Sequence, residues 1–215
     1  MSYTLYYSPG TASMCVHWML IEMGLPFEAR RIDFERNEQR DPQYLRLNPS
    51  GRVPTLIVDG VPRSESAALL MLLTERHPDA NLAPAPGSED RAAWLESMIF
   101  LANTLLPAMR DWFYADKDGD PQGAAAVKAL ARTRIEGANA RLDAQLADGR
   151  SHLVGGRLST VDLLAVMLMR WSRNMPKPAT TWPHAAPYIQ RLRALPSFIE
   201  LYRREGLTEW ANAPQ

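Results

Sequence analysis

The sequence predicts a chain of two parts, a small mixed α/β part followed by an all-helical part. Short runs that suit strands alternate with helical runs up to about residue 78. The next stretch, "HPDANLAPAPGSED", is rich in proline and small residues and suits neither helix nor strand. Almost everything after it has helical periodicity. The predicted parts are therefore residues 1–78 and 89–215, joined by a linker at 79–88.

The composition is that of a soluble globular protein. The 215 residues include 24 basic and 24 acidic side chains, so no cationic field builds up and we expect no nucleic acid or anionic membrane as partner. One cysteine cannot form an internal disulfide. No secretory signal is visible, and the uninterrupted apolar run at 163–169 is far shorter than the roughly 20 residues that span a bilayer. We expect a cytoplasmic protein.

The first part reads as β-α-β-α-β-β-α. Aromatic and β-branched residues predict a strand at 3–7, and the alternation in "PFEARRID" predicts a second. Between them lies a helix over 12–23, which ends at Gly24. A short irregular helix follows in "DPQYLRLNPSG".

The last elements of the first part are a hairpin and a helix. Asp59-Gly60 between two apolar runs predicts the hairpin, because both residues tolerate positive φ. Pro62 cannot donate to a ladder, so the second hairpin strand should lie at a sheet edge. Ser64 is the predicted cap of a helix over 65–77.

The second part contains only helices. A long helix is predicted over 89–116, capped by Ser88 and kinked at Pro107. Apolar residues at spacings of three and four predict the next helix, and "LSTVDLLAVMLMRW" is apolar nearly all round, as a buried helix would be. The remaining predicted helices span 124–146, 158–171 and, divided at Pro196, 184–206.

Residues 51–66 combine three binding features. A proline before a strand leaves the backbone groups of Val53 free for another extended chain. Ser64-Glu65-Ser66 begins a helix, whose unpaired N–H groups attract a carboxylate, and Glu65 can hold an ammonium group. Each feature alone also fits a loop proline or an ordinary helix cap. Together they describe a receptor for a short zwitterionic peptide.

Ser159 and Asp162 stand in the spacing of a capping box before the apolar helix. A buried helix cannot leave its first N–H groups to water, so we interpret this pair as a folding device.

In these segments the chain resembles cytosolic glutathione transferases, specifically the bacterial beta-like kind. The resemblance is carried, in order and over nearly the whole length, by "LYYSPG", "NPSGRVPTL", "RSESAALL" and "LVGGRLSTVDL". It implies a thioredoxin-like N-terminal domain, an all-α C-terminal domain, usually a homodimer, and an active site in the interdomain cleft. Glutathione is the implied co-substrate, and no metal is implied.

The resemblance also implies roles for residues of the peptide receptor. Pro54 should be cis, and Val53 should pair with the cysteinyl part of glutathione. Glu65 and Ser66 should hold its γ-glutamyl end, and Arg52 is an additional candidate contact for a carboxylate.

The residue that activates the glutathione thiol stays open at this level. The position at which beta-class enzymes carry cysteine is Ala12, which argues against mixed-disulfide chemistry there. Ser13 in the first helical turn is the first candidate, and Tyr7 at the strand end is the second. Ser8 and Thr11 remain as further hydroxyl donors.

Two neighbouring residues of the first helix receive structural roles. Cys15 is the only thiol of the chain, and we expect it to be a small packing residue. His17 lies one turn after Ser13, and we expect it to bond backbone groups.

The second part should supply the pocket for an electrophile, because aromatic and methionine side chains form apolar, adaptable walls. The candidates are Met109, Trp112, Phe113 and Trp171, with Trp210 as a lid. The expected function is attack of the glutathione thiolate on an apolar electrophile. A specialised glutathione-dependent isomerase, dehalogenase, ether-cleaving enzyme or peroxidase, and a non-catalytic protein of the same fold, are the alternatives.

Overall fold

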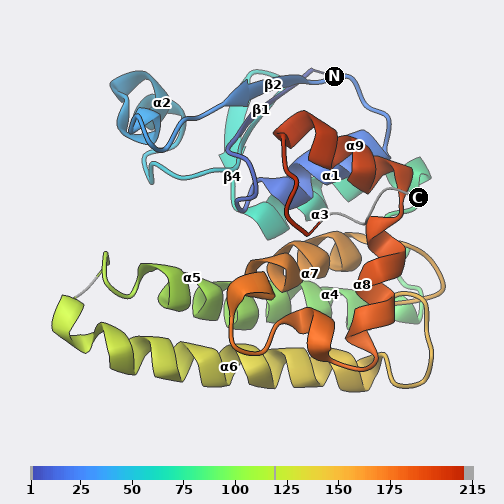
Figure 1. Ribbon diagram of the computed structural model, residues 1–215. Coiled ribbons are helices and arrows are strands. Elements are labelled where there is room, and N and C mark those ends of the chain that lie inside the picture. Colours follow the sequence, from blue (N-terminus) through green and yellow to red (C-terminus); the bar gives the residue numbers. More distant parts are fainter. Residues whose placement is uncertain (1, 119, 211–215) are drawn as a thin grey trace. The chain divides into compact units, whose positions relative to one another are not determined.

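The computed structural model describes residues 2–118 and 120–210 (Figure 1). Two compact units make up the chain. The first unit contains the residues up to Asn81 together with those from Arg193 onward, and the second is Leu82–Leu192. Residues 193–210 thus belong to the first unit, which differs from the boundaries expected from the sequence.

The first unit is built on a four-stranded mixed sheet in the order β2-β1-β3-β4. β1 runs parallel to β2 and antiparallel to β3, and β3 pairs with β4 in the predicted hairpin at Asp59-Gly60. Both hairpin residues have positive φ, as the turn requires. The strands are β1 (Tyr3–Tyr7), β2 (Glu28–Arg31), β3 (Thr55–Val58) and β4 (Val61–Ser64).

Helix α1 forms the centre of the first unit. Its residues from Met14 to Leu20 are buried on every side, because β1, α3 and α9 all pack around it. Figure 1 shows the last helix, α9, beside the first helix, α1, within this unit. The helices are α1 (Met14–Glu22), α2 (Pro42–Leu47), α3 (Ser66–Arg76) and α9 (Pro196–Glu205), with short 3-10 turns η1 (Glu38–Arg40) and η2 (Pro78–Ala80).

The second unit is entirely helical in its described residues and is centred on α7. The predicted capping box is present at its start, where the Asp162 carboxylate accepts a 2.8 Å hydrogen bond from the Ser159 N–H. The unit contains α4 (Asp90–Phe100), η3 (Leu101–Leu105), α5 (Leu106–Tyr114), η4 (Pro121–Gly123), α6 (Ala124–Gln145), α7 (Thr160–Trp171), η5 (Ser172–Asn174), η6 (Ala179–Thr181) and α8 (Ala185–Arg193).

Three helix boundaries differ in detail from the sequence prediction. Ser64 ends β4, and Glu65 occupies the cap position of α3. Helix α4 is preceded by Glu89, while the Ser88 hydroxyl donates instead to the Ala85 carbonyl. The predicted interruption at Pro107 takes the form of a π-helical segment, η3, after which the proline sits in the first turn of α5, where no N–H is needed.

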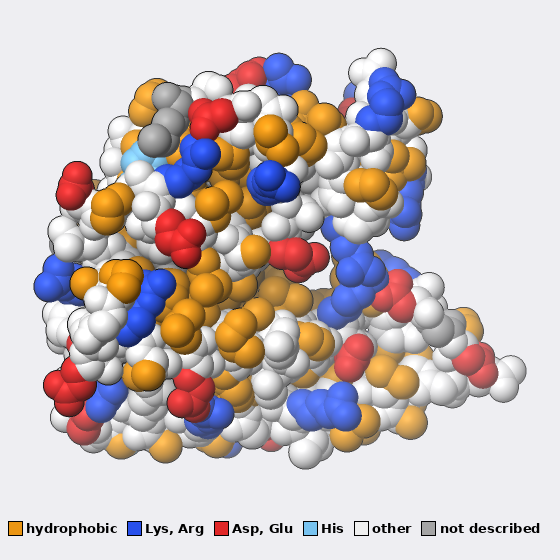
Figure 2. Space-filling view, turned by 180° about the vertical axis from the view of Figure 1, so that it is seen from behind, with side chains coloured by type: hydrophobic (Ala, Val, Ile, Leu, Met, Phe, Trp, Pro, Cys, Tyr) orange, Lys and Arg blue, Asp and Glu red, His pale blue; other side chains and the backbone are white. Residues whose placement is uncertain are grey.

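Helices α4 and α5 and the π-helical segment between them form one continuous helical run, Asp90–Tyr114. By length and composition it is apolar enough to cross a membrane, although only 33% of its apolar window is buried. No uninterrupted apolar stretch in the sequence revealed it, because Ser97, Asn103 and Thr104 divide the apolar residues between Glu96 and Arg110. Figure 2 shows one face of the molecule, on which acidic and basic side chains are scattered among apolar ones.

Candidate active site

The loop between β1 and α1, residues 8–13, is held together by its own hydroxyl groups. The Ser13 side chain is fully buried, and its oxygen lies 3.2 Å from both the Ser8 N–H nitrogen and the Ser8 carbonyl oxygen. It also lies 2.9 Å from the Thr11 hydroxyl, which itself donates to the Ser8 carbonyl at 2.7 Å. The Ser13 hydroxyl therefore braces the loop from inside.

Two other elements of the first unit bond to the same loop. The Ser66 hydroxyl, at the start of α3, donates to the Ala12 carbonyl at 2.9 Å. The Gly10 N–H donates to the Glu205 carboxylate of α9 at 2.8 Å. The loop is thus fixed from both sides by residues that are distant from it in sequence.

The segment before β3 presents an unpaired backbone. The Val53-Pro54 peptide bond is cis, as the resemblance implied. The preceding carbonyl, that of Arg52, accepts hydrogen bonds from the Tyr44 hydroxyl at 2.5 Å and from the Asn48 amide at 2.9 Å. The N–H and C=O of Val53 have no partner within residues 2–118 and 120–210. They are available to a bound extended chain.

Glu65 has a backbone conformation that L-residues rarely adopt, with φ 72° and ψ 109°. Such strain persists where the surroundings impose it and is common at ligand sites. The Glu65 side chain is exposed and has no partner among the residues that the structure describes. It lies directly at the N-terminus of α3, so a carboxylate acceptor and free helical N–H groups lie next to each other.

Tyr7, at the end of β1, carries a half-buried phenol. Partial burial, followed by the charge of Glu205, raises the pKa of Tyr7, and the charge of Arg31 opposes this shift. The phenol therefore keeps its proton at neutral pH. Its ring lies 4.9 Å from the His17 ring, and its hydroxyl has no hydrogen bond to any described residue.

Cys15 lies fully buried in α1. Burial raises the pKa of its thiol to about 12, and hydrogen bonding with Ser66 only partly opposes this. The thiol donates to the Ala12 carbonyl at 3.5 Å. These surroundings fit the packing role expected for Cys15.

His17 bonds to a residue that the sequence did not single out. Its Nδ1 lies 2.8 Å from the Glu205 carboxylate, and both side chains are buried. The partner is a side chain, whereas a backbone group was expected. No local pattern could have identified Glu205, because the two residues are 188 positions apart.

The candidate electrophile residues lie in the second unit. Phe113 is 41% exposed and meets the half-buried Trp171 edge to face, with 6.5 Å between the ring centroids. Trp112 is half-buried, while Met109 is fully buried in the core. Trp210 belongs to the first unit, where its ring lies 4.7 Å below the Arg193 guanidinium.

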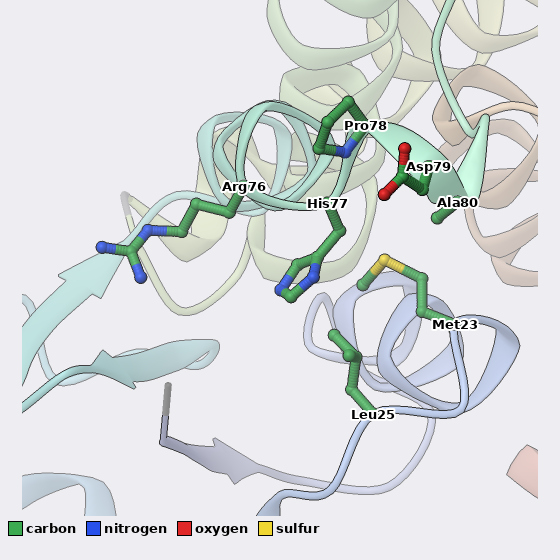
Figure 3. Close-up of a pocket in the computed structure, with 7 residues that line it drawn as sticks. All are labelled: Met23, Leu25, Arg76, His77, Pro78, Asp79 and Ala80. Atoms are coloured by element: carbon green, nitrogen blue, oxygen red, sulfur yellow. The ribbon is translucent and has the colours of Figure 1, made fainter.

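A separate hollow of the first unit lies where α1 and α3 end (Figure 3). His77 points toward Met23 and Leu25 in this view, and its Nε2 is 2.8 Å from the Tyr3 hydroxyl. The hollow is lined by Met23, Leu25, Arg76, His77, Pro78, Asp79 and Ala80. It therefore contains none of the predicted glutathione residues. Within the described ranges, no group of three or more His, Cys, Asp or Glu side chains is placed to hold a metal ion.

Comparison with known proteins finds a family match in each of the two units. Residues 1–73 match the family model of the glutathione S-transferase N-terminal domain, and residues 96–196 match that of the C-terminal domain. Glutathione S-transferase GST-4.5 of Xanthomonas campestris is 28% identical, over 94% of this chain and 98% of its own.

Solved structures agree with the sequence matches. A sphingomonad glutathione S-transferase complexed with glutathione is 30% identical, with a TM-score of 0.83, over 95% of this chain and 100% of its own. The bacterial beta class enzyme of Sphingomonas chungbukensis is 29% identical, with the same TM-score and the same coverage of both chains. The predicted fold class is confirmed, and the chain belongs to the glutathione transferase family.

Proposed function

We propose that this glutathione transferase binds glutathione in its first unit and activates the thiol for attack on an apolar electrophile. The observation that carries the proposal is the unpaired backbone of Val53 before cis-Pro54, in the same unit as the free carboxylate of Glu65. A short peptide with a free ammonium group and a carboxylate matches these groups. The similar sphingomonad enzyme supports this reading, because it was solved with glutathione bound.

Each part of the peptide has a proposed partner. The Val53 N–H and C=O pair with the cysteinyl residue, in the manner of an added strand. Glu65 binds the γ-glutamyl ammonium group, and the N–H of Ser66 at the start of α3 binds its carboxylate. Arg52 is the proposed contact for the other carboxylate.

The hydrogen bonds of the two candidate hydroxyl groups favour Tyr7 as the donor to the thiolate. Ser13 has one hydroxyl proton, and that proton is engaged within the loop by Ser8 or Thr11. The raised pKa of Tyr7 keeps its phenol protonated, and this O–H has no competing acceptor among the described residues. Tyr7 therefore stabilises the sulfur anion, and Ser13, the first candidate from the sequence, holds the loop that positions it.

The chemical step is a displacement. The thiol proton leaves to solvent, the thiolate forms a carbon–sulfur bond with the electrophilic carbon, and the leaving group departs with its electron pair. In the second unit, the exposed faces of Phe113 and Trp171 are the proposed contact for the apolar electrophile.

Calorimetric titration with glutathione and a conjugation assay on an aryl halide test this function. We expect binding, turnover, and a loss of roughly tenfold or more in kcat/KM for Tyr7→Phe. Ser13→Ala should lower the melting temperature, because the loop loses its internal hydrogen bonds. At a temperature where the variant is folded, its kcat/KM should change less than that of Tyr7→Phe. Absence of glutathione binding would overturn the function, and unchanged turnover in Tyr7→Phe would overturn the assignment of Tyr7.

A homodimer is the proposed assembly. Leu95 and Ile99 stand one turn apart on α4 and are 38% and 50% exposed. They belong to the apolar run Asp90–Tyr114, so an apolar helix face is open to solvent in the single chain. A second copy of the chain would cover this face. Sedimentation should show a dimer, and Ile99→Glu should shift it toward monomer; a monomeric parent protein would contradict the assembly. Cytoplasmic location is proposed as well, in line with a single buried, unpaired cysteine.

A further inference from the structure

Two adjacent arginines on β2 have different electrostatic surroundings. Arg30 is neutralised locally, because its Nε lies 2.8 Å from the Glu28 carboxylate. It also donates to the Tyr6 hydroxyl at 3.0 Å. The Arg31 side chain is exposed and has neither an ion pair nor a hydrogen bond to any residue in the described ranges. Its positive charge is uncompensated.

Strand geometry directs Arg31 toward Tyr7. Successive side chains of a strand point to opposite faces, so Arg31 lies on the other face from Arg30 and Tyr6. β1 and β2 are parallel, and Arg31 is the register partner of Tyr7. The Ile32 N–H donates to the Tyr7 carbonyl at 2.7 Å, which fixes this pairing at its end. Neighbouring strands lie about 4.8 Å apart, so the two side chains start side by side.

The titratable and charged groups around Tyr7 come from three elements. β2 contributes Arg31, α1 contributes His17, whose ring lies 4.9 Å away, and α9 contributes Glu205. On β3 the residue nearest in register is Thr55, which pairs with Tyr6. The threonine side chain does not titrate. Glu205 disfavours an anion at the Tyr7 hydroxyl and Arg31 favours one. Glu205 is itself engaged by His17 and the Gly10 N–H, whereas Arg31 is unpaired.

We propose that Arg31 is an electrostatic positioning residue of the thiol site, whose free guanidinium favours the thiolate form of the bound glutathione held by Tyr7. This inference rests on the proposed function. A cation beside a developing sulfur anion stabilises it through space, without contact with the reacting atoms. The arrangement differs from a helix N-terminus or a hydroxyl donor, because salt weakens the attraction of an exposed cation.

The test compares Arg31→Gln with its matched control, Arg30→Gln, which removes an arginine from the same exposed strand but from the opposite face. For each variant the pH dependence of kcat/KM is measured from about pH 5.5 to 9.5 with glutathione and an aryl halide. The ultraviolet absorbance of the bound thiolate is titrated in parallel.

We expect Arg31→Gln to shift the thiol titration to higher pH. At pH 6.5 its kcat/KM should fall roughly two- to fivefold and should approach that of the parent above pH 9, since a shift of half a unit is about threefold. Arg30→Gln should keep the parent profile, and Arg31→Lys should restore it. Added salt should narrow the gap between the parent and Arg31→Gln.

The outcomes separate the two proposals. If the parent protein binds glutathione and Arg31→Gln has the same pH profile as Arg30→Gln, the role of Arg31 is overturned and the proposed function stands. If the parent protein does not bind glutathione, both are overturned. A loss of rate in Arg31→Gln that is equal at every pH also contradicts the electrostatic role, because it indicates a contact with substrate.

Discussion

The imidazole of His17 lies 2.8 Å from the carboxylate of Glu205, and this pair connects the first helix of the chain to the last. The second carboxylate oxygen of Glu205 accepts the Gly10 N–H, so the pair also holds the loop before α1. Removing the carboxylate takes away the bonding partner of the buried His17 Nδ1 and one bond of the Gly10 N–H. We expect Glu205→Ala to lower the free energy of unfolding by about 2–4 kcal/mol.

Chemical denaturation measures this loss, and Glu200→Ala provides the control. Glu200 lies on the same helix but pairs on the surface with Arg203 and Arg204. We expect its substitution to leave the unfolding midpoint nearly unchanged. Equal midpoints for the two variants would show that the buried pair adds no stability.

The buried thiol of Cys15 should be unreactive in the folded protein. Its pKa is raised to about 12 by burial, so almost no thiolate exists at pH 8. A chromogenic disulfide reagent should label Cys15 only after unfolding. Rapid labelling of the native protein would contradict this.

The same thiol predicts a pH dependence of stability. The folded pKa is raised above the ordinary value of 9.0, so the unfolded chain loses this proton first as the pH rises. The stabilising contribution is complete below about pH 9 and is lost between there and about pH 12. Between pH 9 and 10 the free energy of unfolding should fall more steeply for the parent than for Cys15→Ala, because the contribution of the tyrosines is the same in both proteins.

The carboxylate of Glu65 should act on glutathione affinity and not on the fold. Glu65→Gln keeps a side chain at the strained backbone position but removes the charge. We expect KM for glutathione to rise roughly tenfold or more, because a hydrogen bond to a charged group is worth about 1.5–3 kcal/mol. The melting temperature should remain close to that of the parent.

The control for this charge is Glu75→Gln, on the same helix. The Glu75 side chain is exposed and has no partner among the described residues. Its substitution should leave KM unchanged. Similar KM values for both variants would remove Glu65 from the glutathione site.

Gly51, which precedes the Arg52-Val53-Pro54 segment, should not tolerate a side chain. Its φ is +61°, and an added Cβ would lie 2.9 Å from the Gln39 carbonyl oxygen and 3.0 Å from Nη1 of Arg40. Gly60 also has positive φ, at +84°, but an added Cβ would meet nothing within 4 Å. Comparing alanine substitutions at the two positions therefore separates the cost of backbone strain from the cost of steric overlap.

Thermal or chemical unfolding of Gly51→Ala and Gly60→Ala makes the comparison. Gly60→Ala should cost about 1–2 kcal/mol from its backbone alone. Gly51→Ala should cost about 1–3 kcal/mol more because of the overlap, and should also raise KM for glutathione. An equal loss in both variants would mean that the loop relaxes around the new methyl group.

Local rules predicted much of this structure. The hairpin at Asp59-Gly60 and the capping box of Ser159 and Asp162 follow from turn and cap chemistry within a few residues, and both are present. The peptide receptor at Val53 and Glu65, whose features are adjacent in sequence, could be predicted in the same way and stays a prediction.

Features that depend on distant packing were not predicted. Ser13 was placed on the correct helix end, but nothing local indicates that Ser8 and Thr11 surround its hydroxyl. Glu205 and Arg31 act on Tyr7 through tertiary placement and strand pairing. The order of residues along the sequence shows neither the position of Glu205 beside Tyr7 nor the pairing of Arg31 with it.

The return of α9 to the first unit has a consequence for synthesis. The N-terminus leaves the ribosome first, yet α1 obtains its Glu205 and Ser197 partners only after all of residues 82–192 have been made. The second unit, continuous from Leu82 to Leu192, has all its residues earlier. Until α9 has been synthesised, the nascent first unit exposes the surface of Trp18 that Phe198 later covers. Docking of α9 is therefore the step that removes this apolar surface from solvent during synthesis.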